Sequence, residues 1–153
     1  MITKKKKLNI KTRIYNANLI SGNKKTVEKN LLKSLKKLQK LSNKRHTQVL
    51  KLSIKNLTPA LKMDKQKMKR RKRKGLQEIP TFIRNNFLRI NLALKDITKN
   101  SKNRNESTKF YNKLSKEIID SANFNSASIT QKTELQNKVL LQKNLFFKFR
   151  WKR

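Results

Sequence analysis

The residues of this chain best suited to chemistry form a run of cations near its middle. Residues 67–75 read KMKRRKRKG, and Arg70, Arg71 and Arg73 lie among lysines there. An arginine guanidinium can hold a phosphate through two hydrogen bonds or stack on a base, whereas a lysine supplies a point charge. The run therefore predicts contact with a phosphate backbone; its lysines are Lys67, Lys69, Lys72 and Lys74. A solvated loop without fixed contacts is the alternative, since a charge cluster alone proves no contact.

The charge balance of the whole chain points to a polyanionic partner. The 153 residues include 42 Lys and Arg but only 8 Asp and Glu, which gives a formal net charge of +34. Self-repulsion at this charge opposes a compact state, so we expect a polyanion in the working form. Nucleic acid is the first candidate, because neutralised phosphates release counterions and drive binding. An anionic membrane surface is the second candidate.

The sequence offers no set of residues for catalysis or for a metal. His46 is the only histidine and there is no cysteine, so a catalytic triad, a thiolate metal site and a disulfide framework all lack parts. The 8 acids are spread singly along the chain, and no glycine-rich phosphate loop is present. Ser34 and Lys37 match a Ser-x-x-Lys pattern, which arises by chance in a lysine-rich helix. We therefore predict a protein that is not an enzyme and that uses no cofactor and no metal.

Apolar residues at helical spacing predict a mainly α protein, a small bundle of six helices. A first helix would span 11–20, and Gly22 and Asn23 would separate it from the second. The second helix carries an apolar stripe of Val27, Leu31, Leu35 and Leu38, which Leu32 and Leu41 would widen. A third helix would span 46–57 and end before Pro59.

The second half of the chain predicts three more helices. Their stripes are Ile83, Phe87, Ile90, Leu94 and Ile97, then Phe110, Leu114, Ile118 and Ala122, and last Leu135, Val139, Gln142 or Leu141, and Leu145. Ser128 and Gln131 have capping-box spacing at the start of the last helix. No apolar run approaches about 20 residues, so we expect no membrane insertion.

The interval 59–82 does not fit a helix. It contains the basic run and no long apolar face, and it lies between two proposed core helices. A connection of this length inside a compact domain is unusual and often functional. Its second half contains Leu76, Ile79, Phe82 and Ile83, enough apolar content to return as a strand. We therefore predict a two-stranded β-ribbon that protrudes between the third and fourth helices, although lysine-rich sequence is poor strand material.

Five short motifs follow one another along the chain from Arg13 onward. They read NLISGNKKTVEKNLLKSL at 18–35, IKNLTPAL at 54–61, KRRKRKGLQEIP at 69–80, LSKEIIDSA at 114–122 and NLFFKFRW at 144–151. Glu134 also lies at the matching distance before Trp151. In this order the motifs resemble those of the small-subunit ribosomal protein of family seven, of the bacterial and organellar type.

The resemblance implies both a fold and a role. Proteins of that family have a six-helix body with a protruding β-ribbon, bind the 3′ domain of small-subunit ribosomal RNA early and organise the head of the subunit. The ribbon and the helical surface would lie near the exit-site tRNA and the outgoing mRNA, with proteins of the head and platform as neighbours. The resemblance assigns the ribbon to 67–74 and further RNA contacts to Lys24 and Lys25.

Other basic residues complete the predicted RNA interface. Residues 1–8 would form a basic arm that seeks phosphates, or else a disordered solubilising tail, and 9–153 a single RNA-binding helical domain. The arm contributes Lys4, Lys5, Lys6 and Lys7, and the domain adds Arg13, Arg84, Arg89, Lys148, Arg150 and Trp151. Trp151 could stack on a base, whereas Phe146, Phe147 and Phe149 are expected to pack at a helix end.

Two other function classes stay open from the residues. A general basic DNA-binding protein of the nucleoid or chromatin kind is the alternative, although nothing resembles a DNA-reading helix-turn-helix. An amphipathic membrane-binding protein is the third class, although the aromatic residues gather near the end of the chain rather than opposite the lysines of a helix.

The chain is rich in Lys, Asn, Ile and Phe, which have AT-rich codons. We therefore expect a mitochondrial small ribosomal subunit, possibly with an organelle-encoded gene, in preference to a plastid one.

Overall fold

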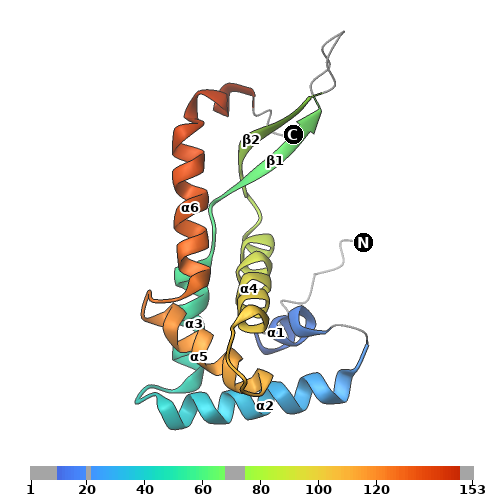
Figure 1. The fold of residues 1–153 in the computed structure, drawn as a ribbon, viewed down its shortest axis with the longest axis vertical. Helices are drawn as coiled ribbons and strands as arrows, with labels where there is room; N and C mark the ends of the chain where they lie inside the picture. Colours follow the sequence, from blue (N-terminus) through green and yellow to red (C-terminus); the bar gives the residue numbers. More distant parts are fainter. Residues whose placement is uncertain (1–9, 20–21, 68–74, 149–153) are drawn as a thin grey trace, which may run out of the picture.

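A computed structural model describes residues 10–19, 22–67 and 75–148 (Figure 1). In these ranges six α-helices form a helical body, and one two-stranded antiparallel ribbon protrudes from it between the third and fourth helices, as predicted. The elements are α1 (Ile10–Asn18), α2 (Lys24–Leu41), α3 (His46–Leu57), β1 (Leu61–Lys67), β2 (Leu76–Phe82), α4 (Asn86–Asn103), α5 (Phe110–Ala122), α6 (Ala127–Leu141) and the 3₁₀ helix η1 (Lys143–Lys148). The predicted arm 1–8 lies outside the described residues.

Helix α5 lies at the centre of the helical body. It packs against α2, α3, α4 and α6, and its predicted stripe faces inward. Leu114 and Ile118 of this stripe are almost wholly buried, together with Leu38 of α2, Ile54 of α3 and Leu94 of α4. One hydrophobic cluster therefore joins α1 to α5, and the ribbon stands away from it beside α6 (Figure 1).

The apolar stripe of α2 is narrower than predicted. Leu31 and Leu38 are buried and Leu35 is half-buried, as the spacing indicates. Leu32 and Leu41 are exposed, so the prediction that they widen the core stripe is wrong. Leu32 follows Leu31 and is turned about 100° around the helix axis from it. Leu41 is the last residue of α2, where the chain turns away from the core.

The longest predicted stripe crosses a boundary between two elements. Ile83 is buried, but it follows β2 and extends the ribbon pairing, because its N–H donates to the carbonyl of Ala60 at 2.9 Å. Helix α4 begins only at Asn86, where the side chain of Asn85 accepts the N–H of Phe87 at 2.9 Å. Phe87 is exposed and Ile90 is the first stripe residue of α4 that packs against the core, so the core face starts about two turns later than predicted.

The capping residue of α6 also differs from the prediction. Ser126 caps the helix and accepts the N–H of Ile129, whereas Ser128 lies inside the helix and is buried. The hydroxyl of Ser128 donates to Glu117 of α5 at 2.6 Å. A buried carboxylate needs such donors, and this requirement outweighs local capping. Further along α6, Val139 is buried as predicted, but Leu141 is exposed.

Arg104, which directly follows α4, gathers three of the acids of the chain. Its guanidinium pairs with Asp120 and lies 3.5 Å from Glu106 and 4.0 Å from Glu117. Lys116 also pairs with Glu106, at 2.8 Å. Acids that are scattered in the sequence thus converge where α4, α5 and α6 meet. Glu117 is only 2% exposed, so the pairing with Arg104 and the bond from Ser128 compensate a charge that has left water.

Two ionisable groups of this Arg104 cluster have shifted pKa values. The hydrogen bond to Asp120 raises the pKa of Arg104, so the guanidinium stays cationic. The hydrogen bond from Lys116 lowers the pKa of Glu106. Both shifts favour the charged forms, which hold the end of α4 against α5.

Within the described ranges, no helix combines the length and the apolar character that crossing a bilayer requires.

Replacing Arg104 by Met tests the Arg104 cluster. Arg104→Met should lower the free energy of unfolding by about 3 kcal/mol, because Glu117 stays buried beside Asp120 without its cation. Urea denaturation at neutral pH measures the loss. Lys95→Met removes the same charge from an exposed position of α4 and should change the stability by less than about 0.5 kcal/mol. Equal losses in the two variants would contradict the role given to Arg104.

The lowered pKa of Glu106 predicts a pH-dependent stability. A carboxylate with a lowered folded-state pKa stabilises the fold above its unfolded value of about 4.5, and the effect is lost as pH falls through the folded-state pKa. Glu106→Gln should therefore melt below the wild type at pH 7, and the gap should close as the pH falls below 4.5. Thermal melts across this range test it, with Glu134→Gln, an exposed position of α6, as the control that shows no gap. A gap for Glu106→Gln that does not change with pH would refute it.

Candidate nucleic-acid interface

The root of the ribbon is anchored to the helical body. Nε of Arg89 in α4 donates to the carbonyl of Pro59 at 2.9 Å, directly before β1. Ile79 and Thr81 of β2 are buried, β2 packs against η1, and β1 packs against α6. The base of the ribbon therefore has a fixed direction relative to the helices, and the strands extend from it beyond the start of α4 (Figure 1).

The charges within the two strands are close to balanced. Lys65 lies directly opposite Glu78 in the antiparallel register, with 3.7 Å between Nζ and Oε1, and such cross-strand pairs favour the pairing. Lys62 pairs with Asp64 at 2.7 Å, and Thr81 donates to the same carboxylate at 3.2 Å. The connection from Lys67 to Gly75 instead contains six consecutive cationic residues, 69–74. The excess charge of the ribbon thus belongs to the connection between its strands.

Several residues predicted to bind RNA fall outside the described residues. They are Lys4, Lys5, Lys6, Lys7, Lys69, Arg70, Arg71, Lys72, Arg73, Lys74, Arg150 and Trp151. Lys67 is the last residue of β1, and Lys148 is the last residue of η1.

Three predicted arginines gather near the start of α4, although one of them belongs to α1 and is far from α4 in the sequence. Arg84 is exposed and lies in the short connection between β2 and α4. Arg89 is half-buried and holds the ribbon root through Pro59. Arg13 of α1 lies over the ring of Phe87, with 4.3 Å from its guanidinium carbon to the ring centre. Arg13 and Arg89 therefore have structural contacts of their own.

A second basic surface covers α2. Seven of its 18 residues are lysines, Glu28 is its one acid, and the predicted RNA ligands Lys24 and Lys25 are exposed in its first turn. Figure 1 shows α2 at the end of the helical body opposite the ribbon. Helix α2 is therefore a cationic surface separate from the ribbon strands, and the described structure does not bring Lys24 and Lys25 together with the ribbon.

Lys132 of α6 is a basic residue at the ribbon root that the sequence did not single out. Its ammonium donates to the carbonyl of Asn56, and burial lowers its pKa. With Pro59 and Leu61 it lines a groove of about 250 Å³ below β1. In the sequence Lys132 is one of many lysines in a polar stretch, so no pattern could have indicated its burial.

The residues that match catalytic patterns have structural hydrogen bonds within or between the helices. Ser34 is buried and donates to the carbonyl of Leu31 at 2.7 Å, while Lys37 donates to Asn112 at 2.8 Å. His46 is half-buried, and its ring Nδ1 lies 3.1 Å from the side chain of Gln39. In the ranges 10–19, 22–67 and 75–148, no group of His, Asp or Glu is arranged to hold a metal ion.

Comparison with known proteins confirms the resemblance that the five motifs indicated. Residues 2–139 match the family described as Ribosomal protein S7p/S5e. The Small ribosomal subunit protein uS7 of Heliobacterium modesticaldum (strain ATCC 51547 / Ice1) is 30% identical over 141 residues, which cover 92% of this chain and 85% of that protein. The protein of the same name from Geotalea uraniireducens (strain Rf4) is 28% identical over 139 residues, or 91% and 85% of the two chains. The family consists of structural ribosomal proteins rather than enzymes. With most of its length matched, this chain belongs to the Ribosomal protein S7p/S5e family.

Proposed function

We propose that this chain, as a structural protein of the small ribosomal subunit, binds the 3′ domain of the ribosomal RNA and organises assembly of the head. The observation that carries the proposal is the anchored ribbon, whose strands are joined by six consecutive cations in a chain that matches a ribosomal family over residues 2–139. In a ribosome, the phosphates of the RNA are the groups that a structural protein meets most often. The excess of cations in this chain favours binding to them, because phosphate contacts release counterions.

The separation of the two cationic surfaces suggests how binding can be selective. The strands that lead into the ribbon connection and helix α2 lie at opposite ends of the described structure (Figure 1). A rigid protein with cationic segments at two ends gains binding free energy from both segments only where the RNA places two stretches of its backbone at the matching distance. The proposed recognition is therefore mainly of RNA shape, as is usual for folded RNA. Arginines 70, 71 and 73 would grip phosphates at one end, and the lysines of α2 would hold a second segment.

We further propose that the ribbon lies near the exit-site tRNA and the mRNA exit path, with proteins of the head and platform as neighbours. The support is the protruding ribbon together with the family match. The abundance of residues with AT-rich codons supports a mitochondrial subunit. Sedimentation of the tagged protein with the small subunit of a mitochondrial fraction would test this location, and its recovery only with another ribosome population would exclude it.

Binding measurements with two polyanions test the RNA proposal. The chain should bind a transcript of the 3′ domain at least about a hundredfold more tightly than duplex DNA of equal length at physiological salt, because only the RNA matches both surfaces. The affinity should fall steeply with added salt, as phosphate contacts require. Filter binding or fluorescence anisotropy gives both values. Equal affinities would favour a general DNA-binding protein instead.

Removing the arginines of the ribbon connection tests its share of the binding. The triple variant Arg70→Ala, Arg71→Ala, Arg73→Ala should weaken binding to the transcript and reduce the slope of log affinity against log salt by about 3, one unit for each phosphate that is no longer held. The melting temperature should stay the same, because the hydrophobic core cluster is built from residues of the helices and includes none of these arginines. Assembly of the head, followed by sucrose-gradient profiles, should be impaired.

A variant of α2 provides the matched control for this experiment. Lys29→Ala, Lys36→Ala and Lys40→Ala remove three charges from exposed positions of α2. Hydroxyl-radical footprints should show that the two triple variants lose protection at different nucleotides. Loss of the same protections to the same degree would mean that only total charge matters, and the two-surface proposal would then be rejected.

A further inference from the structure

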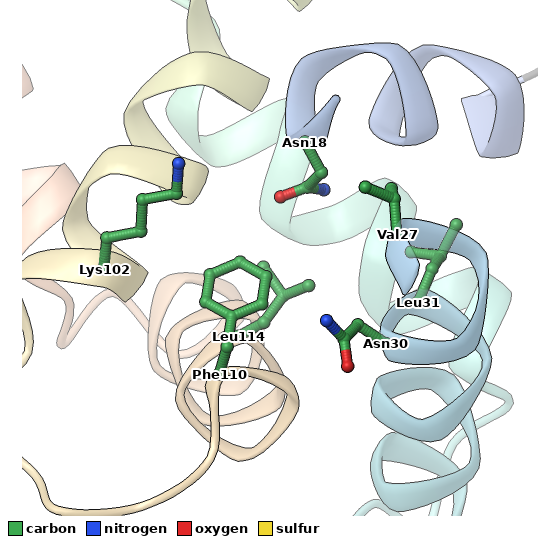
Figure 2. A pocket seen from close by; sticks show the side chains of 7 residues that line it. All are labelled: Asn18, Val27, Asn30, Leu31, Lys102, Phe110 and Leu114. Atoms are coloured by element: carbon green, nitrogen blue, oxygen red, sulfur yellow. The ribbon is translucent and has the colours of Figure 1, made fainter. Parts of the chain in front are cut away.

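A small cavity lies where α1, α2, α4 and α5 approach one another (Figure 2). It has a volume of about 160 Å³, and its walls are Asn18, Val27, Asn30, Leu31, Lys102, Phe110 and Leu114. A water needs only about 10–15 Å³ of such volume, so this space is much larger than the site of a single structural water. The cavity lies beside the first turns of α2, close in the chain to Lys24 and Lys25.

One wall of the cavity carries an acceptor without a hydrogen-bond partner. Asn18 is only 8% exposed, and its Nδ2 donates to the carbonyl of Ile14 at 2.9 Å. This bond fixes the orientation of the amide, and Oδ1 has no partner among the described residues. Figure 2 shows Oδ1 directed toward the space between α1 and α5. A buried polar atom is normally satisfied, so an unsatisfied one at a cavity wall indicates a ligand that donates a hydrogen bond.

The other walls narrow the class of ligand. The ring of Phe110 and the side chain of Leu114 form an apolar side, while Asn30 and Lys102 lie on opposite sides of the space (Figure 2). Lys102 is exposed, so its ammonium can meet a phosphate at the mouth. A flat ring with N–H donors on one edge and a phosphate attached outside satisfies all of these groups. Unpaired nucleotides have this chemistry, and they bind proteins by stacking on aromatic side chains.

We propose that this cavity holds one unpaired base of the small-subunit ribosomal RNA, turned out of its strand. The base edge donates to Oδ1 of Asn18, its face lies against Phe110, and its phosphate meets Lys102. The inference rests on the proposed RNA-binding function and adds a site that reads a base, whereas the ribbon and α2 contact the backbone. A phosphate surface alone positions the protein, and a base pocket fixes its register on the RNA.

Asn18→Leu tests the pocket, because leucine keeps the number and branching of the side-chain heavy atoms and removes the acceptor. Affinity for the 3′-domain transcript should fall about tenfold, the effect typical of removing one hydrogen bond to a base. In the wild-type complex, dimethyl sulfate or carbodiimide probing should reveal one unpaired base protected on its pairing edge. The variant should restore the reactivity of this base while keeping the hydroxyl-radical footprint of the backbone. Its melting temperature should not fall, since an unsatisfied buried acceptor has been removed.

Lys102→Gln and Lys95→Gln form a matched pair of variants that test the pocket without changing the buried residue Asn18. Both remove one charge from an exposed site of α4, about two turns apart, and only Lys102 lines the cavity. Lys102→Gln should weaken binding and partly expose the same base, whereas Lys95→Gln should leave its protection unchanged. This pair keeps the test decisive if Asn18→Leu does not fold.

Three outcomes would overturn the proposal. If the wild type binds the transcript and no base depends on Asn18 or Lys102, the pocket is no base site, although the RNA-binding function stands. In a second outcome no base is protected, Asn18→Leu binds the bare transcript like the wild type, and the variant is impaired only in assembly mixtures that contain other small-subunit proteins. The occupant of the cavity is then a protein side chain. If the wild type does not select the transcript over duplex DNA, the RNA-binding function fails and the base site fails with it.

Discussion

The shortage of acids is the constraint on which the rest of this structure depends. Eight carboxylates face 42 cationic side chains, so the fold cannot neutralise itself and can only place its few acids well. Three of them surround Arg104, where α4, α5 and α6 meet, and two lie in the ribbon strands beside lysines. Charge is thus compensated where elements join. Helix α2 has seven lysines and one acid, and the sequence 69–74 contains no acid at all, so these two segments carry an excess of charge that suits a polyanion.

This distribution separates stability from binding. The core that α5 organises consists mainly of apolar stripes, with hydrogen-bonded polar groups such as Ser128 and Glu117 beside them. The exposed lysines of α2 lie outside that core, and α2 and the ribbon strands lie at opposite ends of the described structure. In the proposed function, the cationic charge favours binding through counterion release, and the separation of the two regions makes the shape of the RNA matter. The ribbon is held at its root without acids, by the bond from Arg89 to Pro59, the bond from Ile83 to Ala60, and packing against α6 and η1.

Some basic residues contribute to the architecture as well as to the candidate interface. Arg89 ties the ribbon to α4, Arg13 lies over Phe87, and Lys132 donates to the carbonyl of Asn56. Their side chains order the surfaces from which more exposed cations extend. Asn18 is the opposite case, because its buried Oδ1 lowers stability as long as it has no partner. In the proposed base site, this acceptor gains its partner when the RNA binds.

The sequence by itself determined the helical character, the position of the ribbon and the excess of charge, because these follow from local spacing and composition. The segment 46–57 and the stripe from Phe110 to Ala122 form helices with the predicted bounds. Only the tertiary structure decided where polar groups are buried, since that depends on partners far apart in the chain. Ser128 bonds to Glu117 instead of capping α6, three scattered acids meet at Arg104, and Ile83 joins the ribbon rather than α4. A periodic pattern in the sequence indicates which side of an element is apolar. The free energy of a buried charge depends instead on the hydrogen-bond donors and opposite charges that the tertiary structure places beside it.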